Sequence, residues 1–157
     1  MELNKTPRTV YLLTYHCVFV TKYRRKVINN ELGDLLKRDA SYIIDNFGGE
    51  LVSAETDEDH IHILMSLPPQ ISPGKVIKTM KSHMSREAHT QYGEHIQKYL
   101  WGKDTPFWSP SYFVVTTGTT SLDRVKEYIE SQRTDEHKRK YIKSGKHKRQ
   151  KNGHSSQ

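Results

Sequence analysis

The run VYLLTYHCVFV at residues 10–20 is the strongest constraint on the fold. It is rich in β-branched and aromatic residues, which favour strands, and it is long enough for the central strand of a sheet. Its Cys17 is the single cysteine of the chain, so an intrachain disulfide is excluded. We interpret that residue as a small buried hydrophobe in a protein of a reducing compartment.

Length and hydropathy limit the class of protein. At 157 residues the chain is long enough for one domain with its own hydrophobic core. No apolar segment approaches the roughly 20 residues that a membrane-spanning helix requires. The N-terminal residues MELNK also lack the apolar segment of a signal peptide. We therefore expect a soluble, cytoplasmic protein with no membrane partner.

Strand and helix patterns alternate along the rest of the chain. Asn29 or Asn30 caps the first predicted helix, Gly48-Gly49 ends it, and Ser72-Pro73 begins the second. After the opening strand, the predicted elements are a helix at 32–47, strands at 50–55 and 60–67, a helix at 76–88, a strand at 107–116 and a helix at 122–129.

The order β-α-β-β-α-β-α predicts an α+β protein of the ferredoxin-like, split βαβ type, with an antiparallel sheet and one extra C-terminal helix. We expect one domain at residues 1–133 and a basic, flexible tail at residues 134–157. The tail carries eight Lys and Arg against two acidic residues, a net of +6 out of the formal +7 of the whole chain. It is either a solvated tail or a non-specific arm for phosphates, and the two interpretations are compatible.

Two short segments carry the candidate chemistry. In the predicted strand at residues 60–67, His60 and His62 point to the same face because alternate side chains share a face. In the predicted helix at 122–129 and its continuation, Tyr128 and Gln132 are four residues apart and also share a face. Two imidazoles, an amide oxygen and a phenol at one point could hold a divalent metal and direct a tyrosine at a phosphate. Each segment alone is weak evidence for a site, since such histidines and tyrosines often only pack against their neighbours. Asp59 either orients a histidine or belongs to the turn.

The chain closely resembles the single-tyrosine HUH transposases of small insertion sequences, the TnpA type. HUH means His-hydrophobe-His, which is His60-Ile61-His62 here, and the resemblance spans residues 10–133. Departures are the turn TGTT at residues 117–120, where many relatives have Val-Gly, and the long tail. The other matching blocks are HCVFVTKYRR at 16–25, FWSPSYF at 107–113 and VKEYIESQ at 125–132.

The resemblance implies a transposase that cuts and rejoins single-stranded DNA at insertion-sequence ends. By this resemblance Tyr128 is the nucleophile and forms a 5′-phosphotyrosine, and His60, His62 and Gln132 bind Mg²⁺ or Mn²⁺. The resemblance also implies recognition of terminal hairpins, and a homodimer in which the tyrosine helix of one subunit serves the histidine pair of the other.

Basic and aromatic residues around this site are candidates for contact with DNA, although surface charge or core packing explains each of them equally well. His16 is ambiguous between the strand core and the edge of the site. The candidates for phosphate contact are Lys22, Arg24, Arg25, Lys78 and Lys81, and those for base stacking are Tyr23, Trp101 and Trp108.

Two alternatives remain open. A host-adapted relative would apply the same chemistry to repeated chromosomal hairpins, and the DNA flanking the gene would separate it from a mobile copy. A non-catalytic nucleic-acid-binding module would bind DNA in the presence of EDTA and form no covalent adduct. A zinc hydrolase fits less well, because a third His, Cys or carboxylate ligand is missing at a recognisable spacing.

Overall fold

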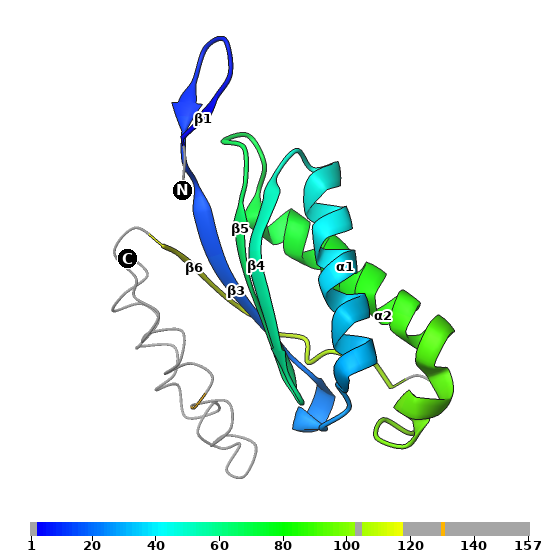
Figure 1. Cartoon of the computed structure of the whole chain (residues 1–157). Coiled ribbons are helices and arrows are strands. Elements are labelled where there is room, and N and C mark those ends of the chain that lie inside the picture. Colours follow the sequence, from blue (N-terminus) through cyan, green and yellow to red (C-terminus); the bar gives the residue numbers. More distant parts are fainter. Residues whose placement is uncertain (1–2, 103–104, 118–129, 131–157) are drawn as a thin grey trace. The chain divides into compact units, whose positions relative to one another are not determined.

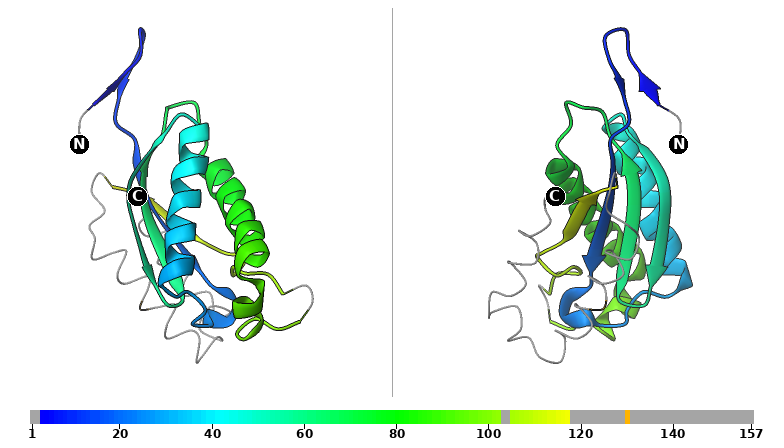
Figure 2. Two further views of the ribbon diagram at one scale, coloured as in Figure 1. Left: turned by 45° about the vertical axis from the view of Figure 1, so that its right-hand side comes forward. Right: turned by 90° about the vertical axis from the view of Figure 1, so that its left-hand side faces the viewer.

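The computed structural model describes residues 3–102, 105–117 and 130, and all but the last belong to one compact unit, Met1–Gly118. In that unit a four-stranded sheet carries both helices on one face (Figure 1 and Figure 2). The elements are β1 (Asn4–Lys5), β2 (Val10–Tyr11), β3 (Thr14–Val20), α1 (Asn30–Asn46), β4 (Glu50–Asp57), β5 (His60–Ser66), α2 (Pro73–Gln97) and β6 (Phe113–Thr116).

The main sheet has the strand order β4-β5-β3-β6, and all its pairs are antiparallel. This is the order of a ferredoxin-like split βαβ sheet, so the predicted α+β architecture is confirmed. The strand β5 lies in the interior of the sheet between β3 and β4, whereas β4 and β6 are edge strands. Strands β1 and β2 form a separate two-stranded hairpin that projects beyond the sheet (Figure 2).

Local signals explain where α1 begins and ends. The side chain of Asn29 accepts a hydrogen bond from the amide of Leu32, as an N-cap does. Gly48 adopts φ +83° directly after the helix, a conformation that favours glycine. A Cβ on Gly49 would lie 2.5 Å from the carbonyl oxygen of Ser66, so only glycine allows the chain to enter β4 at this distance.

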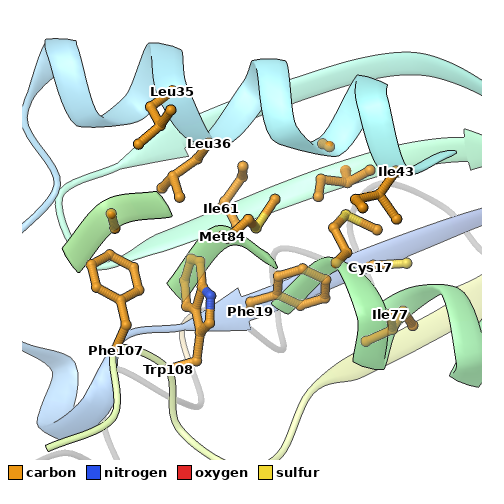
Figure 3. Close-up of a cluster of buried hydrophobic side chains, with 14 of the residues drawn as sticks. Cys17, Phe19, Leu35, Leu36, Ile43, Ile61, Ile77, Met84, Phe107 and Trp108 are labelled. Carbon is orange, nitrogen blue, oxygen red and sulfur yellow. The ribbon is translucent and has the colours of Figure 1, made fainter. Parts of the chain in front are cut away.

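The core lies between the sheet and the two helices (Figure 3). Ser72 caps α2 by accepting a hydrogen bond from the amide of Lys75, and the helix deviates from helical geometry at Tyr92. Cys17 is fully buried in this core, as predicted, and burial raises the pKa of its thiol. The buried side chains come from one stripe of each helix and one face of the strands, including Phe19, Leu32, Leu36, Ile44, Ile61, Ile63, Met80, Met84 and Phe107.

The bounds of three elements differ from the prediction by more than two residues. The second helix, predicted at 76–88, spans Pro73–Gln97. The opening run is divided into β2 and β3, because its first two residues pair with β1 in the hairpin instead of with the sheet. The last predicted strand begins at Phe113 and not at residue 107. In the preceding segment Pro106 and Pro110 lack the N–H that a ladder needs, and Trp108 makes only an isolated bridge with Thr21.

The predicted helix at 122–129 and the tail at 134–157 lie outside the described residues, as does the predicted domain boundary at residue 133. Among the described residues, Glu130 is helical and exposed. Within the described part of the chain, neither helix combines the length and apolar composition needed to cross a membrane.

Candidate active site

The two histidines of the His-Ile-His motif lie on β5. Their side chains occupy the sheet face opposite the helices, because Ile61 and Ile63, which alternate with them, are fully buried in the core. The two imidazole rings are nearly parallel, with centroids 6.4 Å apart and an interplanar angle of 26°. The prediction that both rings share one face is therefore confirmed.

Asp59 connects His60 to Arg24. Its Oδ1 lies 2.8 Å from His60 Nδ1, and its Oδ2 accepts hydrogen bonds from Arg24 Nε at 3.0 Å and from Arg24 Nη2 at 2.9 Å. Burial opposes ionisation of Asp59, but the hydrogen bonds from His60 and Arg24 outweigh it and lower the pKa of this carboxyl to about 2. An ionised carboxylate only accepts, so His60 donates from Nδ1, and Nε2 is the ring nitrogen that remains for a metal.

A left-handed turn brings Arg24 to Asp59. Tyr23 and Arg24 have φ of 58° and 55°, which is uncommon for two successive residues other than glycine. One backbone and one side-chain hydrogen bond hold the turn. The amide of Lys22 donates to the carbonyl of Phe107 at 2.9 Å, and the hydroxyl Oγ1 of Thr21 donates to the carbonyl of Arg25 at 2.7 Å. Strain of this kind persists where the surroundings determine the conformation, and it is concentrated at functional sites.

Replacing Arg24 with alanine should destabilise the fold by about 3 kcal/mol, because it removes the guanidinium that donates both hydrogen bonds to Oδ2 of the buried Asp59 carboxylate. Only 7% of the Arg24 side chain and 8% of the Asp59 side chain are exposed. The matched control is Arg25→Ala, since Arg25 is the exposed neighbour and should change stability by less than about 0.5 kcal/mol. Urea unfolding measures both variants, and equal midpoints would contradict a structural role of the ion pair.

The surroundings of His62 favour its neutral form. Burial lowers its pKa, the neighbouring charge of His60 lowers it further, and Glu55 on β4 opposes these effects. His16 also lowers the pKa of His62, since its position on β3 places it on the same sheet face. Neutral imidazole is the form that binds metal. His16 therefore lies beside the histidine pair and not in the core between the sheet and the helices.

The donors of the described residues fit part of a metal site. Two imidazoles on one face, one of them held by a carboxylate through Nδ1, match ligands for Mn²⁺ or Mg²⁺ that keep further positions for oxygen donors. Within residues 3–102 and 105–117, no group of three or more His, Cys, Asp and Glu side chains is arranged to hold a metal. The predicted third ligand, Gln132, and the predicted nucleophile, Tyr128, lie outside the described residues.

The candidates for DNA contact fall into two groups. Tyr23, Arg25, Lys78 and Trp101 are exposed and Lys22 is partly exposed, so these side chains are available to a partner. Arg24 is not available to a partner, because its guanidinium is bound to Asp59.

Lys81 and Trp108 have partners within the domain. The ammonium of Lys81 donates to the carbonyls of Ser109 and Ser111, at 2.8 and 3.2 Å, and burial lowers its pKa to about 8. Trp108 is only 5% exposed and packs edge-on against Phe19 and Phe107 (Figure 3), so the core interpretation holds for it. Lys81 therefore ties the segment after Trp108 to α2, beside a cavity of about 420 Å³.

Comparison with known proteins identifies relatives of the whole domain. The family described as "Transposase IS200 like" matches residues 9–132. The ISDra2 transposase TnpA of Deinococcus radiodurans is 32% identical over 136 residues, which cover 87% of this chain and 95% of the relative. The transposase for insertion sequence element IS200 of Salmonella typhimurium is 30% identical over 122 residues, 75% of each chain.

Solved structures share the fold. A crystal structure of a Deinococcus radiodurans protein described as a transposase has a TM-score of 0.72 at 32% identity, and the match covers 82% of this chain and 97% of that one. A REP-associated tyrosine transposase bound to a REP hairpin has a TM-score of 0.51 at 13% identity, over 82% of this chain and 67% of that one. The histidine pair on β5 thus lies in a chain that belongs to the IS200-like transposase family, whose activity is DNA cleavage and strand transfer.

Proposed function

We propose that this protein is a transposase that cleaves and rejoins single-stranded DNA at insertion-sequence ends through a 5′-phosphotyrosine on Tyr128. The observation that carries this proposal is the hydrogen-bonded series Arg24–Asp59–His60 beside His62. This series orients one imidazole of an interior strand so that it can bind a metal. The chain that carries it belongs to a transposase family. A DNA-binding module without catalysis has no need of a buried carboxylate that holds a histidine through Nδ1.

We propose His60, His62 and Gln132 as the ligands of Mg²⁺ or Mn²⁺. Such an ion, when bound, neutralises the phosphodiester and polarises its phosphoryl oxygen. The protein's own residues determine how the ligands are presented: Asp59 holds the His60 ring through Nδ1, and β5 fixes the separation of the two rings. The amide oxygen of Gln132 would add the hard donor that Mg²⁺ prefers.

Tyr128 is proposed to attack the scissile phosphorus through its phenol oxygen. The phenol loses its proton, the new O–P bond forms, and the bond from phosphorus to the 3′ oxygen breaks; that oxygen leaves as a 3′-hydroxyl after taking up a proton. The 5′-phosphate stays on Tyr128, and attack by a 3′-hydroxyl on the phosphotyrosine reverses the step and releases the phenol. Because the covalent bond conserves the energy of the phosphodiester, rejoining needs no ATP.

We further propose that the substrate carries terminal hairpins and that two subunits share the active sites. Support for hairpin recognition comes from family membership, and the REP-associated transposase of the same fold was solved with a hairpin bound. The shared site follows from the resemblance stated above, and mixing two inactive variants tests it, as described in the Discussion.

The proposal predicts that single-stranded oligonucleotides from the ends of the element form an SDS-resistant adduct with the protein in Mn²⁺. The adduct should disappear in EDTA and should not form with the same sequence as a fully paired duplex. Gel electrophoresis of the labelled oligonucleotide measures it. DNA binding without an adduct under any metal condition would support the non-catalytic module instead.

A further inference from the structure

Exposed aromatic rings and cations form one cluster next to the left-handed turn. Trp101 is 60% exposed and Tyr23 is 56% exposed. The Arg25 guanidinium carbon lies 4.7 Å from the ring centroid of Trp101 and 5.9 Å from that of Tyr23, while Lys22 Nζ lies 5.0 Å from the Tyr23 ring. We call these four residues the stacking platform.

The stacking platform is attached to the same residues that hold His60. The left-handed conformation of Tyr23 and Arg24 lets Arg24 reach the buried Asp59 while its two neighbours stay exposed. The amide of Thr21 also donates to the carbonyl of Asp59, at 2.9 Å. Arg24 and Asp59 therefore connect the turn to His60 through short hydrogen bonds, and Trp101 joins the platform through the contact of its ring with the Arg25 guanidinium.

The chemistry of the platform selects its partner. An aromatic ring stacks on any unpaired base, and an arginine plane between two rings adds both stacking and charge. The cations at positions 22, 25 and 26 supply the positive potential that follows a phosphate backbone. Bases in a duplex are already stacked on each other, so their faces are not available to Trp101 or Tyr23. An acidic peptide would use the charges but not the flat faces of the rings.

We propose that Tyr23, Arg25 and Trp101 bind unpaired bases of single-stranded DNA and so place the neighbouring phosphate at the histidine pair. This inference rests on the proposed function, because it assigns a role to the platform within the same cleavage reaction. It concerns binding alone, so it can be tested without metal and without cleavage.

The test compares the affinity of the full chain for a labelled short oligothymidylate and for a duplex, in EDTA and at fixed salt, by fluorescence anisotropy. Trp101→Ala should weaken binding of the single strand about tenfold and leave the duplex almost unchanged, as expected for loss of one stacked base. The matched control is Tyr42→Ala, since Tyr42 is 57% exposed on α1 and its ring lies tilted beside that of His83, outside the platform. That control should bind like the unmodified protein.

A second variant separates stacking from charge. Arg25→Lys keeps the charge and removes the planar group, so it should also weaken binding of the single strand while the salt dependence stays the same. Circular dichroism verifies that each variant is folded. Equal affinities of the Trp101→Ala and Tyr42→Ala variants, or an equal loss for single strand and duplex, would overturn the platform. Because the assay contains EDTA, it measures binding alone, so its result does not depend on whether the covalent adduct forms. If the platform proposal fails, the proposed cleavage by Tyr128 can still be correct.

Discussion

Replacement of Tyr128 by phenylalanine is expected to abolish the covalent adduct with DNA and to reduce strand cleavage by at least about 10³-fold. Removing the nucleophile from a covalent catalyst can cost as much as about 10⁶ in rate, and the remaining groups cannot form the phosphotyrosine. The substitution removes one oxygen and almost no volume, so the affinity for single-stranded DNA should stay within about twofold of the unmodified protein. Denaturing gels measure the adduct, and anisotropy in EDTA measures the binding.

The matched control makes the same chemical change at another tyrosine. Tyr112 is partly buried, and its ring lies 5.6 Å from Lys81 Nζ, so Tyr112→Phe should keep the adduct. An adduct that persists in the Tyr128→Phe variant would move the nucleophile to another residue, with Tyr112 and Tyr141 as the next candidates.

Replacement of His60 or His62 by alanine should eliminate Mn²⁺-dependent cleavage, with a loss of about 10³-fold or more. Each variant loses a proposed metal ligand, and an ion that neutralises the phosphodiester contributes several kcal/mol to the transition state. Gln132→Ala should reduce cleavage less than either histidine variant, because water can replace a neutral oxygen donor. The control is His89→Ala, since that histidine is exposed on α2, where its Nδ1 pairs with the carbonyl of Ser85 and its ring lies edge-on to Phe107. Calorimetric titration with Mn²⁺ reads metal binding directly, and unchanged binding in the His60→Ala variant would remove the histidine from the ligand set.

Mixing the two inactive chains locates the sites in the proposed dimer. If sites are shared, a mixed dimer of His60→Ala and Tyr128→Phe chains contains one site with both defects and one intact site, so cleavage returns. If each site is built from one chain, both sites of the mixed dimer stay defective. Native mass spectrometry should verify that mixed dimers form, and inactivity in their presence would exclude the shared arrangement.

The sequence allowed the sheet and the orientation of the histidine pair to be predicted because both depend on short-range periodicity. Alternation of His60 and His62 with buried isoleucines needs only the two-residue repeat of a strand. The caps at Asn29 and Ser72 are equally local, because each acts on an amide three residues ahead.

Arg24 and the two tryptophans were not predictable in the same way. The ion pair with Asp59 depends on left-handed backbone at Tyr23 and Arg24, and neither residue type signals that conformation. Trp101 and Trp108 are seven positions apart and chemically identical, yet one is exposed and the other packs between Phe19 and Phe107. Their burial depends on how the segment after α2 returns to the sheet, which is a tertiary property.

The interior position of β5 affects how the site responds to heat and denaturant. Amides and carbonyls of β5 are engaged by β3 on one side and β4 on the other, whereas β6 has only β3 as a neighbour in the described sheet. Local opening begins at termini and edge strands, and interior strands open only with the whole domain. The amides of His60 and His62 should therefore be among the slowest to exchange with solvent. Fraying at the sheet edge then leaves the histidine pair intact until the domain as a whole unfolds.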